Sequence, residues 1–380
     1  MMKVQFQNIF RKLREKLFSP TPPFPHSPIL LLFFLFSLLI LSCTDPFPEK
    51  IDYNEGSGVF ICNEGNMTFG NASLSFYDPM LEIVKNQVFY NTNEFPVGDV
   101  LQSMTIIDSL GYLMINNSGK IFVLNTSTML HVATIPGLTS PRYMLPVNKN
   151  TAYISDLYSD HITIFDPHTY KITGTIDLYN SSEEMMLFEG FAYVCSWSFN
   201  NKVYKIETTS HTVSDSIEVA MQPNSIVLDK NDKIWVLSDG GYPGMPGSES
   251  PALSCIDPET FTISKVFVLP YALSSPTELT INPAGDTLYY INNTSEDTRI
   301  LNGVYAHSIG ADVLSTDPLI PSSGRLFYGL GCDPKTGAIY VSDAIDHIQK
   351  GWIFRYTSGG SILDSSKVDI IPGEFCFKPE

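Results

Sequence analysis

Positive charge is scarce in this sequence. Its 380 residues include 23 Lys and Arg against 40 Asp and Glu, which gives a formal net charge of −17 at pH 7. A surface of this kind repels nucleic acid and anionic lipid. The composition therefore argues against a protein that binds along the phosphate backbone of a nucleic acid.

The motifs of several catalytic classes are also missing. The sequence contains no G-x-S-x-G elbow, no H-E-x-x-H, no Gly-rich phosphate loop and no Cys/His cluster with zinc spacing. After residue 43, no segment keeps an apolar helical period for long. Helical bundles and helical solenoids are therefore not expected.

The chain does contain one sequence pattern that is repeated seven times. A short apolar strand ends in small polar residues, and a loop and a second strand follow it. The first strands of the repeats are Val59–Asn63, Tyr112–Asn116, Ala152–Asp156, Ala192–Ser196, Ile234–Asp239, Leu288–Asn292 and Ile339–Asp343. The second strands are expected to start at Leu74, Ile121, Ile162, Val203, Leu253, Val304 and Ile353.

The spacing of the repeats predicts the architecture. Aligned large side chains lie 53, 40, 40, 42, 54 and 51 residues apart, at Phe60, Leu113, Tyr153, Tyr193, Trp235, Tyr289 and Tyr340. A four-stranded propeller blade takes about 40 to 50 residues. The segments are rich in β-branched and aromatic residues and are separated by turn residues, which is the strand signature. We therefore expect an all-β, seven-bladed β-propeller.

Turn chemistry supports the same interpretation. Three second strands end on Asp-Pro, namely Asp78-Pro79, Asp166-Pro167 and Asp257-Pro258. Asp at the first position and Pro at the second favour a type I turn, because the carboxylate binds the backbone and the ring fixes φ.

A wheel of blades needs a closure that leaves no open sheet edges. Blade 1 lacks an innermost strand of its own, and the C-terminal residues 373–377 have the register of one. We expect this tail to complete blade 1. Cys62 and Cys376 would then be neighbours, and a disulfide between them is one possibility. Five cysteines follow Cys43, so a complete set of internal disulfides is excluded.

The N-terminus is expected to be a targeting segment. Five basic residues between Lys3 and Lys16 and a Pro-rich spacer precede an apolar run from Ile29 to Leu41. Thirteen residues suit a signal-peptide core better than a membrane span. The sequence Ile40-Leu41-Ser42-Cys43 resembles a bacterial lipoprotein signal, with Cys43 as the lipidated residue, and an ordinary secretory signal is the alternative. This divides the chain into a signal peptide (1–43), a flexible tether (44–57) and the propeller (58–380).

Candidate ligand residues come from two sets of loops on one face of the expected wheel. The loop between the first and second strands of each repeat joins the second and third strands of a four-stranded blade. Three of these loops carry exposed aromatic residues, namely Tyr158, Trp197, Phe199 and Tyr242. Such residues either contact a ligand or pack against neighbouring loops. The residues entering the innermost strands should surround the axial mouth, and the candidates there are Gln102, Arg142, Tyr143, Glu184, Asn224, Glu278 and Tyr328. We interpret that ring as suited to a large, mostly neutral ligand, without the nucleophile and acid/base pair of a hydrolase.

Histidines and metals give weaker signals. His161 and His347 lie near the expected ligand face, whereas His168 and His211 fall in predicted turns and should be solvated. Propeller lactonases hold an axial metal with Asn, Asp and Glu side chains, but the spacing here singles out no metal site and no catalytic residue. No cofactor is expected.

Two sequence motifs of the first repeat resemble those of a known family. Residues 58–66 read G-V-F-I-C-N-E-G-N, and residues 70–79 read G-N-A-S-L-S-F-Y-D-P. With the lipoprotein signal and the seven repeats, the chain resembles YncE-like propellers, and more narrowly the cell-surface propeller lipoproteins of Bacteroidota. The resemblance extends from about Gly58 to the C-terminus.

The resemblance has functional implications. Members of the BtuG type capture cobalamin at the cell surface and pass it to a TonB-dependent outer-membrane transporter. This implies a lipid-anchored outer-membrane protein whose partners are a corrinoid and such a transporter, with cobalamin as a transported ligand. The alternatives are a propeller that binds a glycan, a siderophore or a protein, a metal-dependent lactonase-like hydrolase, and an adhesive surface protein.

Overall fold

The computed structural model describes residues 53, 58–269, 274–294 and 301–379, which belong to one compact unit, Asp52–Glu380. The expected signal peptide, its Cys43 and nearly all of the expected tether lie outside the described residues. So does part of the loop that follows Asn292. Among the described residues, no helix has the length and apolar character needed to cross a bilayer.

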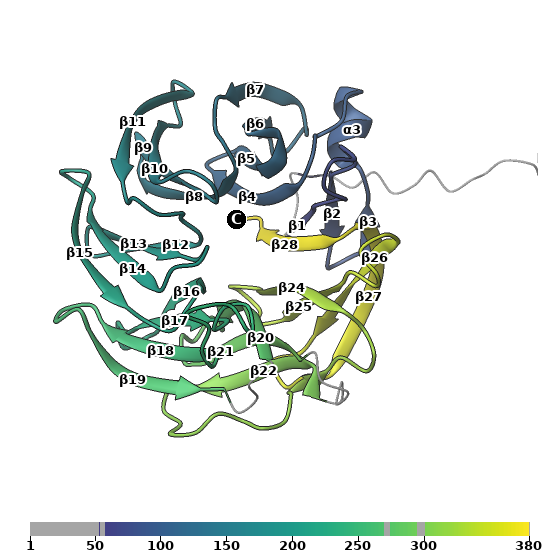
Figure 1. Ribbon diagram of the computed structural model, residues 1–380. Coiled ribbons are helices and arrows are strands. Elements are labelled where there is room, and N and C mark those ends of the chain that lie inside the picture. Colours follow the sequence, from purple (N-terminus) through teal and green to yellow (C-terminus); the bar gives the residue numbers. More distant parts are fainter. Residues whose placement is uncertain (1–52, 54–57, 270–273, 295–300, 380) are drawn as a thin grey trace, which may run out of the picture. The chain divides into compact units, whose positions relative to one another are not determined.

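Seven four-stranded antiparallel sheets form a ring, which confirms the predicted seven-bladed β-propeller (Figure 1). Blade 1 contains β28 (Pro372–Phe377), β1 (Val59–Asn63), β2 (Ser73–Asp78) and β3 (Ile83–Lys85). Blade 2 contains β4 (Leu101–Ile107), β5 (Leu110–Ile115), β6 (Lys120–Asn125) and β7 (His131–Pro136). Blade 3 contains β8 (Pro141–Asn148), β9 (Thr151–Asp156), β10 (His161–Asp166) and β11 (Lys171–Asp177).

The remaining four blades follow in chain order, each running from the innermost strand outward. Blade 4 contains β12 (Met185–Phe188), β13 (Phe191–Ser196), β14 (Lys202–Glu207) and β15 (Thr212–Glu218). Blade 5 contains β16 (Pro223–Leu228), β17 (Ile234–Ser238), β18 (Ala252–Asp257) and β19 (Thr262–Val268). Blade 6 contains β20 (Ser274–Ile281), β21 (Thr287–Thr294), β22 (Gly303–Ser308) and β23 (Ile320–Pro321). Blade 7 contains β24 (Phe327–Cys332), β25 (Ile339–Asp343), β26 (Lys350–Tyr356) and β27 (Ile362–Ile370).

The wheel closes as the sequence predicted. The C-terminal strand β28 pairs with β1 as the innermost strand of blade 1, so segments from the two ends of the propeller share one sheet (Figure 1). Cys62 and Cys376 lie on these paired strands, yet both are free thiols, as are the other three described cysteines. Burial raises the pKa of both thiols well above the usual value.

The core lies between neighbouring blades. Each of the seven aligned large side chains, from Phe60 to Tyr340, is at most 2% exposed. Apolar clusters join adjacent blades around the ring, and one of them packs Val59 and Phe375 of blade 1 against Tyr340 of blade 7. Burial of these side chains is the main stabilising contribution, at about 25 cal/mol per Å² of apolar surface.

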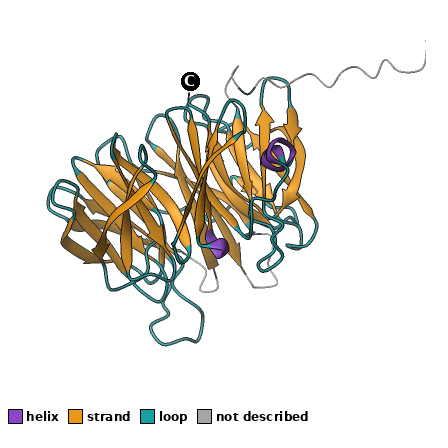
Figure 2. Cartoon of the chain, turned by 90° about the horizontal axis from the view of Figure 1, so that it is seen from above, coloured by secondary structure: helices purple, strands orange, loops and turns teal. Residues whose placement is uncertain are grey.

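The predicted turns form as expected. The carboxylates of Asp78, Asp166 and Asp257 each accept hydrogen bonds from two backbone N–H groups two and three residues ahead. Figure 2 shows how loops gather at the two ends of the strands. The sequence did not predict the short helix α3 (Val88–Asn93) between blades 1 and 2, nor the 3₁₀ turn η1 (Asn116–Ser118).

Candidate functional site

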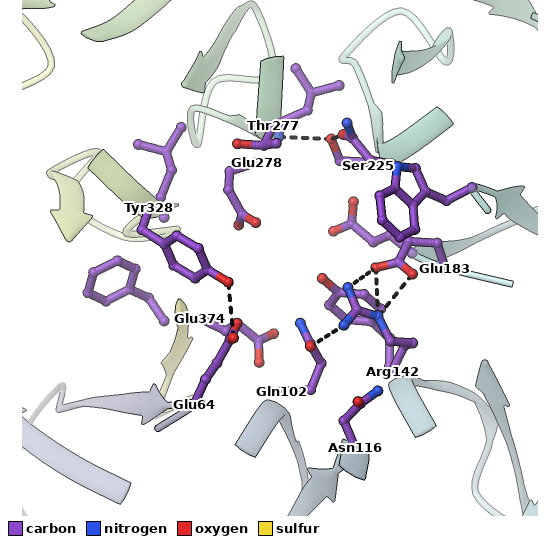
Figure 3. A pocket seen from close by; sticks show the side chains of 18 of the residues that line it. Glu64, Gln102, Asn116, Arg142, Glu183, Ser225, Thr277, Glu278, Tyr328 and Glu374 are labelled. Carbon is purple, nitrogen blue, oxygen red and sulfur yellow. Dashed lines mark hydrogen bonds and ion pairs between the residues drawn. The ribbon is translucent and has the colours of Figure 1, made fainter. Parts of the chain in front are cut away.

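The innermost strands surround a cavity of about 750 Å³ on the axis of the wheel (Figure 3). All seven blades contribute to its lining, each through at least one side chain. This volume lies within the range of about 300 to 1,000 Å³ that is common for small-molecule sites. The cavity is therefore the candidate functional site.

A β-bulge in each blade presents the polar side chains of the cavity. In six blades the register between the innermost strand and its neighbour shifts at the same place. In blade 4, Cys195 alone pairs with both Glu183 and Glu184 through backbone hydrogen bonds of 2.8 and 3.0 Å. A bulge leaves an extra residue outside the ladder and re-aims its side chain. Repetition of this device seven times produces a ring of inward-facing residues.

Nine of the eleven predicted ligand residues line this cavity. They are Gln102, Arg142, Tyr143, Tyr158, Glu184, Trp197, Asn224, Glu278 and Tyr328. Phe199 and Tyr242 do not line it. Their rings contact each other at a centroid distance of 5.8 Å, and they are 66% and 49% exposed.

The lining is more acidic than the sequence predicted. Six carboxyl groups line the cavity, five from Glu64, Glu183, Glu184, Glu278 and Glu374 and one from Asp239. The expected ring of amides, hydroxyls, phenols and one arginine is present, and these carboxyl groups add acidic character to it. Glu64 and Glu374 were missed as site residues. Glu374 occupies the bulge of β28, so the predicted closure was itself a signal that could have revealed it.

Three of the glutamates each accept a hydrogen bond from a backbone N–H group or a tyrosine hydroxyl of a neighbouring blade. The N–H of Met104 donates to Glu374 at 2.7 Å, and the N–H of Ile226 donates to Glu184 at 2.8 Å. The hydroxyl of Tyr328 donates to Glu64 at 3.0 Å. These bonds link blade 1 to blade 2, blade 4 to blade 5 and blade 7 to blade 1.

Arg142 is the one cationic side chain among the described lining residues, and each of its three guanidinium nitrogens donates a hydrogen bond to the protein. Its Nε and Nη2 donate to the carboxylate of Glu183, at 2.9 and 2.5 Å, and its Nη1 donates to the amide oxygen of Gln102. Burial opposes the charge, but the attraction of Glu183 holds the pKa of Arg142 above its usual value. The guanidinium is therefore held at the wall of the cavity by Glu183 and Gln102.

Glu278 differs from the other five carboxyl groups. Its side chain points into the central space (Figure 3), and its carboxyl group has no hydrogen-bond partner among the described residues. Its backbone has φ of 61°, in the left-handed region that non-glycine residues rarely adopt. Strain of this kind is a common property of ligand-binding positions.

Burial and mutual repulsion raise the pKa of several carboxyl groups in the cavity. Burial raises the pKa of Glu64 to about 7 and the pKa of Glu374 to about 8. Burial, followed by the charges of Glu374 and Glu64, raises the pKa of Glu278 to about 8. Burial also raises the pKa of Glu184 well above its usual range. Near neutral pH the cavity therefore contains protonated carboxyl groups, which both donate and accept hydrogen bonds.

Aromatic rings lie beside the acidic groups. Trp197 lines the cavity, and its indole N–H donates to Asp239 at 2.8 Å. Tyr158 also lines it and is 69% exposed. An exposed aromatic ring at the edge of a cavity is a surface on which a ligand can stack.

No histidine in the described part of the chain lines this cavity. His347 contacts the ring of Tyr328 at a centroid distance of 5.6 Å but does not line the cavity, and His161 pairs with Asp160 at 3.1 Å. His168 is exposed, as predicted. His211 is not simply solvated, because its Nδ1 lies 2.6 Å from the hydroxyl of Tyr153. Within the described ranges, no group of three or more His, Cys, Asp and Glu side chains is arranged to hold a metal ion.

Comparison with known proteins identifies the family. Residues 57–369 match the family described as a domain of unknown function (DUF5074). No curated protein matches the chain.

Solved structures match the fold at low sequence identity. A quinonprotein alcohol dehydrogenase-like protein from Bacteroides thetaiotaomicron has 16% identity and a TM-score of 0.61, over 83% of this chain and 77% of that protein. The periplasmic gluconolactonase of Pseudomonas aeruginosa has 8% identity and a TM-score of 0.63, over 85% of this chain and 99% of that protein. A protein from Lactobacillus plantarum has 13% identity and a TM-score of 0.63, over the same shares. At these identities the likeness concerns the fold alone.

Proposed function

The chain belongs to the DUF5074 family, whose description assigns no function, and we propose from its site that it is a ligand-capture protein that binds a corrinoid at the axial mouth. The observation that carries the proposal is the cavity itself. Seven bulges aim polar side chains from every blade at one space of about 750 Å³. Such convergence is typical of binding sites for small molecules and cofactors.

The chemistry of the lining supports a ligand rich in amides. Protonated and ionised carboxyl groups together accept hydrogen bonds from amide N–H groups and donate to amide oxygens. Cobalamin carries amides around its periphery and has an apolar corrin edge. Trp197 and Tyr158 offer rings for that edge beside the acidic groups. The resemblance to the BtuG-type lipoproteins supports the same ligand class.

The setting of the protein is part of this proposal. Lipidation at Cys43 would anchor the mature chain to the outer membrane, and the bound corrinoid would pass to a TonB-dependent transporter. Loss of residues 1–43 removes five basic and one acidic side chain, which leaves 18 basic against 39 acidic residues. A protein with that charge needs a lipid rather than anionic headgroups for anchoring. The substitution Cys43→Ser should move the protein from the membrane fraction to the soluble fraction, and unchanged fractionation would contradict the anchor.

Retention of a corrinoid tests the proposed ligand. Residues 44–380, which include every described strand, are mixed with cyanocobalamin and then desalted. We expect red colour to stay with the protein at one corrinoid per chain. Complete loss of the colour would reject tight corrinoid capture and leave a glycan, siderophore or protein ligand to be tested. Metal-dependent turnover of a lactone or ester would instead support the hydrolase alternative.

A further inference from the structure

The carboxyl groups of the axial cavity have more capacity to accept hydrogen bonds than the protein itself uses. Glu64, Glu184 and Glu374 each receive a bond at one oxygen atom. The carboxyl group of Glu278 receives none from any described residue and points into the open space (Figure 3). A carboxylate can accept about four hydrogen bonds. The cavity therefore offers acceptors that only a ligand or water can satisfy.

The same cavity has no cation to spare among its described lining residues. The three guanidinium nitrogens of Arg142 are bound by Glu183 and Gln102. An anionic group entering the cavity would therefore lie among carboxyl groups without a free positive partner. Burial of a charge under these conditions is costly, because the charge loses water and gains no compensating ion pair.

From this imbalance we propose that the cavity selects ligand groups that donate hydrogen bonds, amides above all, and rejects carboxylates, with Glu278 as the specificity-determining contact. This inference rests on the proposed capture function. It predicts that the protein distinguishes an amidated corrinoid from the same corrin ring with free carboxylates. A neutral amide can donate to the unpaired oxygens of Glu278, whereas a carboxylate is repelled by the ionised form of Glu278.

A structural role explains some of these carboxyl groups but not Glu278. Glu374 and Glu184 bind backbone amides of the adjacent blades, so their loss would affect packing as well as binding. Glu278 makes no such link to the described residues, and it stays in a strained backbone conformation. Its substitution therefore removes no described contact between blades, so its effect on specificity can be measured without a loss of packing.

The test compares two corrinoids on residues 44–380. One is dicyanocobinamide, whose corrin periphery carries amides, and the other is dicyanocobyrinic acid, which carries carboxylates in the same places. Dissociation constants are measured at pH 9 and 0.5 M NaCl, because Glu278, whose pKa is about 8, is mostly ionised at this pH. At this ionic strength the screening length falls to about 4 Å, so the general negative charge of the protein contributes little. We expect dicyanocobinamide to bind about 100-fold more tightly, the size of effect that close like charges produce at an interface.

Two variants locate the discrimination. Glu278→Gln removes the charge but keeps the shape, and it should reduce the preference for the amide to about tenfold or less. Glu259→Gln changes an exposed glutamate in the turn between β18 and β19, and it should keep the wild-type preference. A melting curve confirms that each variant is folded.

Three results would overturn the inference in distinguishable ways. Equal binding of the two corrinoids would reject selection against carboxylates and leave corrinoid capture standing. A wild-type preference that Glu278→Gln does not change would reject the role of Glu278. Absence of binding by both corrinoids and by cyanocobalamin would reject the proposed function itself.

Discussion

Glu278 shows how a single residue can link stability to pH in this protein. It shares the cavity with five other carboxyl groups (Glu64, Glu183, Glu184, Asp239 and Glu374) and also with Arg142, Tyr143 and Tyr328. Burial and the neighbouring charges make its protonated form the more stable one near neutral pH. The unfolded chain lacks these effects, so the same group ionises there near the ordinary value of 4.5.

The free energy of unfolding should therefore fall as pH rises from about 5 to about 8.5. Between the unfolded pKa of 4.5 and the folded values of about 7 and 8, the folded state binds more protons than the unfolded state. Stability then decreases with pH across this window. We expect a lower melting temperature at pH 8.5 than at pH 5.5, measured by circular dichroism. The difference should shrink in Glu278→Gln and persist in Glu259→Gln, and a melting temperature that rises with pH would contradict the account.

Trp197 is the aromatic residue with the clearest expected contact to the ligand. Its truncation in Trp197→Ala should raise the dissociation rate of the corrinoid about tenfold, since buried aromatic contacts at interfaces commonly contribute more than about 1 kcal/mol. Tyr242→Ala is the matched control, because Tyr242 contacts Phe199 outside the cavity. Stopped-flow displacement measures both rates. A Trp197→Ala variant with lower melting temperature and unchanged dissociation would assign this ring to packing.

Some residues of the candidate site could be predicted from the sequence, and others could not. The alignment of repeats placed Gln102, Arg142 and Asn224 on the cavity, because the bulge recurs at one register in every blade. It could not place Phe199 and Tyr242, since loop conformation depends on contacts that have no period. Glu64 and Glu374 were not predicted, because they come from a loop and from the closing strand, outside the aligned set.

At the scale of elements, the closing strand β28 has the greatest consequence. It pairs with β1, contributes Phe375 to the core between blades 1 and 7, and bonds Met104 of blade 2 through Glu374. Deletion of residues 373–380 would remove these contacts and leave an unpaired edge in blade 1.

This deletion should lower the melting temperature sharply, in comparison with the full propeller at the same pH. Differential scanning calorimetry measures the effect directly. An unchanged melting temperature would show that closure by β28 does not stabilise the wheel.

A close approach of β24 to β28 gives a second test at this scale. Any Cβ at Gly329 would collide with the carbonyl oxygen of Gly373 on β28. Gly329→Ala should therefore force the two strands apart and destabilise the protein by about 2 kcal/mol, within the range for overpacking. Gly310→Ala, at a position with no heavy atom within 4 Å, should change stability by less than about 0.5 kcal/mol. Urea denaturation gives both values, and equal effects of the two substitutions would contradict the proposed contact.

Strand positions were predictable because their sequence signal is local. The second strand of each blade, counted from the axis, is rich in apolar residues and is buried on both faces. The third strand, which is the second strand of each sequence repeat, ends at an Asp-Pro turn in three blades. The predicted starts of six third strands, from Leu74 to Val304, lie one residue inside the observed ones. The helix α3 was not predicted, because its six residues, V-F-Y-N-T-N, have neither a helical propensity nor an apolar period.

At the scale of the whole molecule, the closed wheel provides a rigid frame for capture. Because each blade packs against two neighbours, the ring of side chains is held in place before a ligand arrives. Such preorganisation reduces the entropy lost on binding. A dissociation constant of about 1 pM corresponds to roughly −16 kcal/mol, which a mobile site would not provide.

The fold of the whole molecule could be predicted from the number and spacing of the repeats, but the ligand could not. Seven repeats of about 40 to 54 residues permit few architectures. The chemistry of the cavity depends on which side chains the bulges bring together from distant repeats. The six carboxyl groups come from residues as far apart as Glu64 and Glu374, so only the assembled wheel shows that these two join the predicted Glu184 and Glu278.

Calorimetric titration of residues 44–380 with cyanocobalamin is the most direct test of corrinoid capture in the axial cavity. We predict stoichiometric binding with one site per chain. The affinity should be tight enough that the heat saturates abruptly at equimolar corrinoid. Absence of binding heat at micromolar protein, at two temperatures, would contradict the account.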